Sequence, residues 1–191
     1  MTRAFDGRPV SIELIHHLVS LASRAPSAGK TQGWDLVVLR DAETAGFWDV
    51  TLPPERRSGF RWPHLLGAPV IALAFADPSA YVQRYSEADK ANTGLGAGVD
   101  AWPTPYWTID AAMSVNTLLL AAHDAGLGAL FFGVFNGEAE LRARLGVPDH
   151  LQLLGAIALG WPLATPAAPG RGRSANRPRR TPDSIVHNGS W

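Results

Sequence analysis

Apolar residues recur along this chain at two spacings, which together predict a mixture of helices and strands. In residues 12–24 they fall every three to four positions, which is the spacing of one buried helix face. Ser11 precedes this helix and is suited to cap its first turn. Residues 108–125 are apolar almost all round, so we expect a long helix buried on most sides, ended by Gly126.

Continuous apolar runs predict four strands, at residues 34–39, 69–76, 128–135 and 151–159. The second run is almost wholly apolar, which is typical of a central strand covered on both faces. Two short helices are expected, at residues 41–50 and 138–145. Two segments without a clear period are predicted as irregular connections, residues 52–66 and 77–107. A single α+β domain of 191 residues accounts for this pattern.

Composition and charge exclude several classes of function. The 17 basic and 17 acidic residues give zero net charge, so no overall field favours nucleic acid or a membrane surface. There are no cysteines, which excludes disulfides and thiolate chemistry, and the six histidines lack metal-binding spacing. Because the sequence has no signal-peptide core and no apolar run long enough to cross a bilayer, we expect a cytoplasmic protein.

No motif for covalent or metal catalysis is present. The sequence contains neither a G-x-S-x-G elbow nor a Walker A lysine. Gly94, Gly96 and Gly98 form G-x-G-x-G, but no strand precedes them. Trp102-Pro103 follows in place of a helix, which argues against a Rossmann phosphate loop. Without a nucleophile or a metal, the reactivity has to come from a bound cofactor.

The stretch SRAPSAGKTQGW, residues 23–34, has the composition of a binding loop. Small residues in it let a flat ligand approach the backbone, and polar neighbours supply hydrogen bonds. The small residues are Ala28 and Gly29, and the polar ones are Ser27, Lys30, Thr31 and Gln32. An ordinary helix-to-strand turn after Pro26 uses the same residue types. Both interpretations stay open on local chemistry alone.

This stretch resembles the signature A-P-S-x-x-N-x-Q-P-W of the FMN-dependent nitroreductase family. The matching residues are Ala25, Pro26, Ser27, Gln32 and Trp34. Lys30 replaces the usual Asn, and Gly33 replaces the usual Pro. The resemblance implies that the loop lines the flavin, with Ser27 and Lys30 near its ribityl and pyrimidine parts. It thereby assigns FMN contacts to Pro26, Ser27, Ala28, Lys30 and Gln32.

Two further stretches are similar to the family and imply more flavin contacts. Arg3 and Phe5 match the end of an N-terminal R-R-x-x-R-x-F segment. This match would place Arg3 at the N1/O2 side of the flavin ring, where a cation stabilises the reduced form. The alternative is that Arg3 belongs to a disordered chain end. Residues 111–135 match a second signature, in which Phe132 and Gly133 offer a main-chain N–H near flavin N5. A plain strand bulge at Gly133 is the alternative.

Two segments are expected to complete the site. Residues 77–107 form either a long connection packed on the core or a lid, with Trp102, Tyr106 and Trp107 toward the substrate. Residues 163–191 resemble the family's C-terminal arm, which wraps the partner subunit and would bring Arg179 and Arg180 to the FMN phosphate. The family's two leading arginines have no counterpart in this sequence, so this pair would make most of the phosphate contact. Taken alone, this basic tail could also touch nucleic acid.

The resemblance covers nearly the whole chain and implies both a fold and a function. The implied fold is the α+β nitroreductase fold, with a central, mostly antiparallel sheet flanked by helices, a long buried dimer helix and a C-terminal arm exchanged between subunits. The implied function is a homodimeric FMN-dependent oxidoreductase. It would take electrons from NAD(P)H and reduce a small electron-poor acceptor, a nitroaromatic or quinone, by a ping-pong mechanism without a catalytic side chain. Two alternatives stay open: a flavin-fragmenting enzyme that forms dimethylbenzimidazole, and a non-catalytic homologue that binds or sequesters flavin.

Overall fold

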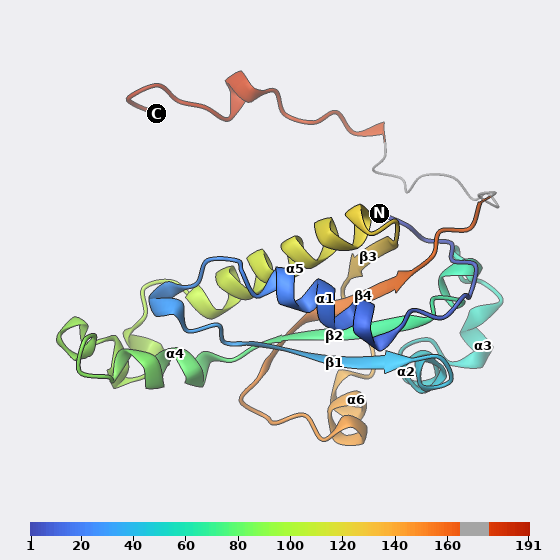
Figure 1. Ribbon diagram of the computed structural model, residues 1–191, viewed down its shortest axis with the longest axis horizontal. Coiled ribbons are helices and arrows are strands. Elements are labelled where there is room, and N and C mark those ends of the chain that lie inside the picture. Colours follow the sequence, from blue (N-terminus) through green and yellow to red (C-terminus); the bar gives the residue numbers. More distant parts are fainter. Residues whose placement is uncertain (165–175) are drawn as a thin grey trace.

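A four-stranded antiparallel sheet forms the centre of the protein. The computed structural model describes residues 1–164 and 176–191. In spatial order the strands are β1 (Trp34–Arg40), β2 (Val70–Ala76), β4 (Gln152–Gly160) and β3 (Gly128–Phe132), and each pairs antiparallel with its neighbour. Every residue of β2 is buried, as its apolar run predicts, because β2 lies inside the sheet and helices cover both faces (Figure 1).

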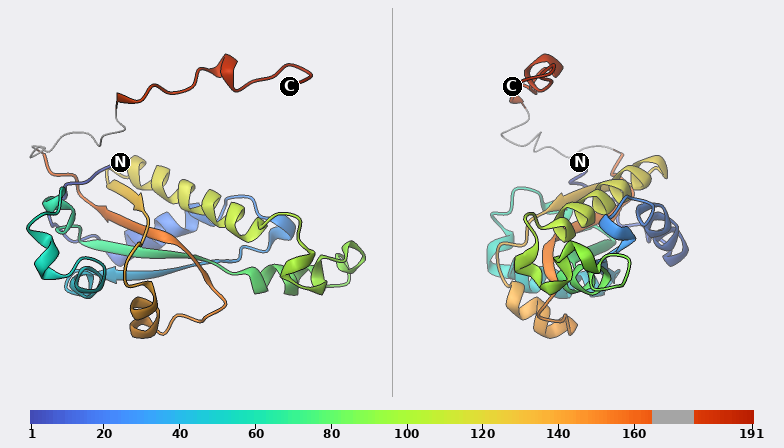
Figure 2. Two further views of the ribbon diagram at one scale, coloured as in Figure 1. Left: turned by 180° about the vertical axis from the view of Figure 1, so that it is seen from behind. Right: turned by 90° about the vertical axis from the view of Figure 1, so that its left-hand side faces the viewer.

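Helices pack on both faces of this sheet. One face carries α1 (Ile12–Ala22) and α5 (Tyr106–Asp124), and the other carries α2 (Glu43–Thr51) and α6 (Glu138–Leu145) (Figure 1; Figure 2). Each face of the sheet packs against its helices in a separate hydrophobic core. Because side chains alternate along a strand, β2 contributes to both of these cores. Ile71 and Leu73 lie in the core with α2 and α6, whereas Val70 and Ala72 lie in the core with α1 and α5. The predicted antiparallel sheet flanked by helices is therefore confirmed.

The two longest helices follow their sequence signals only in part. As predicted, Ser11 caps α1, since its hydroxyl accepts a bond from the backbone N–H of Leu14 at 3.2 Å. Gly126 follows α5 with a left-handed φ of +78°. The outer face of α5 is exposed, with Ile109 at 40% and Leu120 at 62%. The prediction that this helix is buried on most sides is wrong for the single chain, because no described element covers that face.

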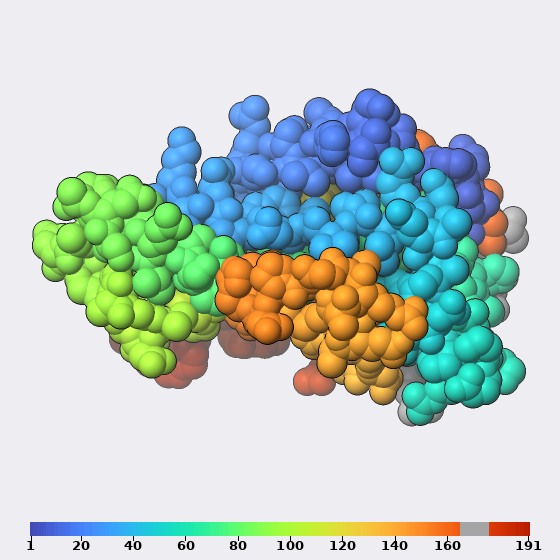
Figure 3. Space-filling view, turned by 90° about the horizontal axis from the view of Figure 1, so that it is seen from below, coloured from blue at the N-terminus to red at the C-terminus, as the bar shows by residue number. Residues whose placement is uncertain are grey.

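Three other expectations about the elements are wrong. Helix α4 (Pro78–Tyr85) and helix α3 (Pro54–Arg57) lie in the two segments predicted as irregular. Helix α4 begins where Asp77 Oδ1 accepts bonds from the N–H groups of Ser79 and Ala80, at 2.8 and 3.2 Å. Strand β3 ends at Phe132 and not at residue 135, because pairing with β4 stops there. Helix α4 and the residues after it form a lobe at one end of the molecule (Figure 3).

The C-terminal segment lies apart from the folded body. Residues 176–191 are all exposed, and Figure 2 shows them separated from the sheet and its helices in both views. Their side-chain hydrogen bonds to other described residues are local, such as the bond from Arg180 Nε to Ser184 Oγ at 3.3 Å. Residues 165–175 of the predicted arm lie outside the described residues. Among the described helices, none has the length and hydropathy that crossing a bilayer requires.

Candidate functional site

A cavity of about 370 Å³ opens between α2, the end of β3 and the N-terminal segment. Arg3, Phe132 and Gly133, three of the predicted flavin contacts, all line it. In the sequence, Arg3 lies about 130 positions before Phe132 and Gly133. The N-terminal segment pairs with β3 through a 2.9 Å hydrogen bond from the Thr2 N–H to the Ala129 carbonyl, and this pairing brings the three residues together. The structure thus places the three residues along one cavity, whereas their contact with flavin stays a prediction.

The walls of the cavity carry hydrogen-bond donors that have no partner. The indole N–H groups of Trp48 and Trp62 are buried without an acceptor, and Trp48 is only 6% exposed. Within residues 1–164 and 176–191, the backbone N–H groups of Gly133 and Val134 make no hydrogen bond either. An unsatisfied buried donor costs about 1–3 kcal/mol. Because the two indole nitrogens have almost no accessible surface, a ligand in the cavity could pair with the backbone N–H groups and not with the indoles.

Arg3 is held in a defined position beside these donors. Its guanidinium carbon lies 5.3 Å from the ring centroid of Trp62, a cation–π contact. Phe5, two residues on, is buried and pairs with Pro162 in an isolated bridge. Arg3 therefore lies in a packed segment and is not a free chain end. The cavity combines a fixed positive charge, unpaired N–H groups and aromatic walls.

The 26–32 loop, also predicted to contact flavin, has an unusual backbone. Gly29, Lys30 and Gln32 have left-handed φ values of +61°, +57° and +55°. This conformation costs roughly 1–2 kcal/mol at each residue other than glycine. The loop is held by its own polar groups, since Ser27 Oγ accepts the Gln32 backbone N–H at 3.1 Å and Gln32 Nε2 donates to the Ser23 carbonyl at 2.9 Å. Strain of this kind clusters at functional sites, which favours a binding loop over an ordinary turn.

Asp110 fastens this loop to α5. Its Oδ2 atom accepts both the Ala28 backbone N–H, at 2.7 Å, and the Tyr81 hydroxyl, at 2.8 Å. Burial raises the pKa of the Tyr81 phenol, and the hydrogen bond to Asp110 raises it further. Sequence reasoning missed Asp110. The available signal was a carboxylate in an almost wholly apolar helix, because a buried carboxylate needs hydrogen-bond donors.

The loop and the cavity lie at different ends of the sheet. The loop precedes β1 and α2 follows it, so the seven residues of β1 separate them by about 20 Å. They also belong to different faces, since Asp110 lies on α5 whereas Phe47 and Trp48 at the cavity lie on α2. The structure does not bring the predicted contacts Pro26, Ser27, Ala28, Lys30 and Gln32 to Arg3 within one chain.

Comparisons with known proteins decide the family. The Nitroreductase family profile matches residues 1–161. The chain belongs to the nitroreductase family. A protein named NADH dehydrogenase from Thermus thermophilus is 28% identical over 84% of this chain and 81% of its own length. A 5,6-dimethylbenzimidazole synthase from Rhodospirillum rubrum is also 28% identical, over 84% of this chain and 76% of its own.

A solved structure confirms the nitroreductase fold. The nitroreductase family protein from Streptococcus pneumoniae TIGR4 superimposes with a TM-score of 0.70 at 20% identity. The superposition covers 97% of this chain and 94% of that one. The predicted family and the predicted helix-flanked antiparallel fold are both confirmed, whereas the dimer helix and the exchanged arm stay predictions.

The aromatic residues predicted as a nitroreductase lid form a packed cluster beside the 26–32 loop. Trp102 is 8% exposed, lies 4.7 Å from the Tyr85 ring centroid and donates its indole N–H to the Leu95 carbonyl. Trp107 donates its indole N–H to Gln152 Oε1 at 3.1 Å. Tyr106 is the most open of the three, at 41% exposure. The packing favours a fixed connection, and the role of these residues toward substrate stays a prediction.

Arg179 and Arg180, the predicted phosphate ligands of this nitroreductase, lie in the exposed C-terminal segment. Both side chains are exposed, and Arg180 bonds only to its neighbour Ser184 among the described residues. The segment that carries them, residues 176–191, lies apart from the sheet and its helices (Figure 1). Their contact with FMN phosphate stays a prediction, and it requires another position of the arm or a second copy of the chain.

Proposed function

We propose that this protein is an FMN-dependent NAD(P)H oxidoreductase that works as a homodimer. The observation that carries the proposal is the cavity at Arg3, with the unpaired backbone N–H groups of Gly133 and Val134. The flavin ring carries acceptors at O2, O4 and N5 and becomes negatively charged at N1 on reduction, so these donors and this cation suit it. When bound, FMN accepts a hydride from the nicotinamide and passes the electrons on.

The protein's own residues would bind and orient the reactants and tune the charge. Arg3 supplies a fixed positive charge for the reduced state, and its stacking on Trp62 keeps it in place. The aromatic rings of Trp48 and Phe132 stack on each other and give the cavity an apolar wall. NAD(P)H and then an electron-poor acceptor, a nitroaromatic or quinone, would use one open face in turn, which is a ping-pong order. No side chain has to act as an acid or a base.

A second copy of the chain would complete each site. The cavity and the 26–32 loop are separated within one chain, so a ligand that touches both has to lie between two copies. Two further observations support this arrangement. The apolar residues Ile109 and Leu120 on the outer face of α5 are exposed, and the exposed residues 176–191 lie apart from the body in Figure 1.

The second candidate is a flavin-fragmenting enzyme, which would consume reduced FMN to make dimethylbenzimidazole. The relative from Rhodospirillum rubrum favours it, because its name is 5,6-dimethylbenzimidazole synthase. The two candidates share the flavin cavity and differ in the fate of the reduced flavin. A non-catalytic homologue would share the cavity and lack turnover.

The deciding experiment is a visible absorption spectrum of the protein with and without FMN, followed by anaerobic addition of NADH or NADPH. Bound flavin that bleaches with either nucleotide, and recovers on adding a quinone, is the expected result. Appearance of dimethylbenzimidazole under oxygen would favour the second candidate. Bound flavin that neither nucleotide reduces would favour the non-catalytic homologue. A protein that takes up no FMN would overturn the proposal.

A further inference from the structure

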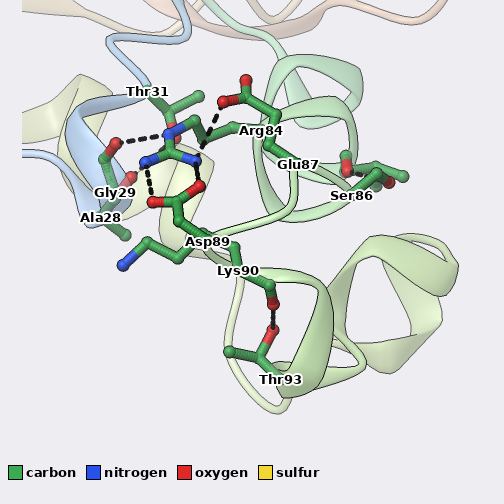
Figure 4. A network of polar contacts seen from close by, with 10 residues as sticks. Ala28, Gly29, Thr31, Arg84, Ser86, Glu87, Asp89, Lys90 and Thr93 are labelled. Atoms are coloured by element: carbon green, nitrogen blue, oxygen red, sulfur yellow. Dashed lines mark hydrogen bonds and ion pairs between the residues drawn. The ribbon is translucent and has the colours of Figure 1, made fainter.

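Arg84, at the end of α4, reaches back to the 26–32 loop. Its Nε donates to the Gly29 carbonyl at 2.9 Å, 55 positions away in the sequence (Figure 4). Its two terminal nitrogens hold Asp89 in a bidentate pair, at 2.7 and 2.8 Å, and Nη1 also contacts Glu87 at 3.2 Å. The side chain is 23% exposed. One guanidinium therefore ties the lobe after α4 to a single carbonyl of the loop.

The bonded carbonyl belongs to the residue where the loop enters its left-handed stretch. Gly29 and Lys30 both have positive φ values, so rotation of the peptide between them would relax the strain. The Arg84 bond fixes the orientation of that peptide plane. The Tyr85 ring packs against the same residue, since it lies 3.0 Å from the position that a Cβ on Gly29 would take. Arg84 and Tyr85 therefore both contact the loop at Gly29, directly before the left-handed residue Lys30.

We propose that Arg84 is a positioning residue for FMN binding, acting through the Gly29 carbonyl on the 26–32 loop. The inference rests on the proposed function, because the loop contacts FMN only if the protein binds it. In this arrangement the lobe after α4 is a support for the loop, held by Arg84 and Asp89, and does not open as a lid. Removing the guanidinium frees the strained peptide, so the loop spends less time in its binding conformation and the apparent affinity for FMN falls.

The chain offers a matched control for Arg84. Arg142 has a similar exposure of 20%, pairs with Glu138 at 2.9 Å and donates to the Leu151 carbonyl at 2.8 Å. It therefore makes the same kinds of contact, but to the connection before β4. A loss of affinity that comes from general destabilisation should appear equally in Arg84→Met and Arg142→Met.

The test is a titration of the full-length protein with FMN, followed by flavin fluorescence and by the visible circular dichroism of the bound ring. We expect Arg84→Met to raise the Kd for FMN about tenfold and to change the dichroism, which reports ring orientation. Arg142→Met should stay within twofold of wild type with an unchanged spectrum. Arg84→Lys, which cannot hold Gly29 and both Asp89 oxygens at once, should lie between Arg84→Met and wild type.

Other outcomes would overturn the inference. Equal FMN affinity in wild type and Arg84→Met would refute the role of Arg84 and leave the proposed function standing. An equal loss of FMN affinity in Arg84→Met and Arg142→Met would do the same. Should Arg84→Met fail to fold, Asp89→Asn keeps Arg84 and weakens only its anchor. We expect about a threefold rise in Kd for Asp89→Asn, and wild-type affinity would contradict the inference. Wild-type protein without any FMN affinity would overturn the proposed function as well.

Discussion

Replacement of Asp110 tests how the 26–32 loop is fastened to the core. A single atom, Oδ2, accepts the bonds from Ala28 N–H and Tyr81 O–H, and the residue is 5% exposed. Hydrogen bonds to charged groups contribute about 1.5–3 kcal/mol each. Asp110→Ala removes two of them and leaves two donors unsatisfied, so the free energy of unfolding should fall by about 3–5 kcal/mol. Asp110→Asn can place an amide oxygen at the same point and should cost only about 1–2 kcal/mol.

The assay is urea unfolding at one fixed protein concentration, because association would make the midpoint depend on concentration. Asp124→Ala is the control, since Asp124 is an exposed aspartate on the same helix. It should change the free energy of unfolding by less than about 0.5 kcal/mol. A loss in Asp110→Ala no larger than that of the control would refute the buried network. Equal losses of unfolding free energy in Asp110→Ala and Asp110→Asn would show that the contribution of Asp110 to stability comes from its charge and not from the position of its acceptor atom.

Three further predictions concern the cavity, the phenol and the arm. Arg3→Met should make the reduction potential of bound flavin more negative by roughly 30 mV, about 1.4 kcal/mol for two electrons. Arg8→Met is its control, because Arg8 stacks on Trp161 at 4.9 Å outside the cavity, and an equal shift in both variants would contradict the role of Arg3. The folded state keeps the Tyr81 proton above its ordinary pKa while the unfolded state releases it near pH 10, so stability should fall from about pH 10 upward. Tyr81→Phe should lower that slope by up to about 1.4 kcal/mol per pH unit in alkaline urea unfolding, and an unchanged slope would refute the assignment. Changing Arg179 and Arg180 together to Ala should weaken FMN binding at least about tenfold, as expected for loss of charged phosphate contacts, whereas Arg177→Ala in the same arm should not. Equal FMN affinity in the double variant and wild type would exclude the phosphate assignment.

The elements with regular spacing could be predicted from the sequence, because burial imposes the spacing. The helix at residues 12–24, the central strand at 69–76 and the helix at 138–145 are all found within one or two residues of their expected ends. Helix α4 was missed because its eight residues lie in a segment whose aromatic residues obscure any period. Its local start signal was Asp77 followed by Pro78, a cap and a suitable first residue.

The candidate site could be predicted as a set of residues but not as an arrangement. Motifs identify Arg3, Gly133 and the 26–32 loop, yet nothing in their spacing tells that the loop and the cavity occupy different ends of the sheet. The contacts that hold the loop join positions far apart in sequence, 82 residues for Ala28 and Asp110 and 55 for Gly29 and Arg84. Such pairs follow from the three-dimensional packing of α4 and α5 on the loop, which a single sequence does not encode as a local pattern.

On the proposed function, the separation of the cavity from the 26–32 loop would couple FMN binding to dimer formation. The cavity would contribute Arg3 and the backbone N–H groups of Gly133 and Val134 to FMN binding. The 26–32 loop would contribute Ser27 and Lys30. If FMN contacts both, each bound flavin joins two chains, and binding stabilises the pair by RT ln(1 + [FMN]/Kd) at each site. The exposed face of α5 then need not hold the dimer unaided. The contacts of Arg84 and Asp110 with the loop would favour such a pair as well, because a loop that is already ordered loses less entropy when it binds flavin and a second chain.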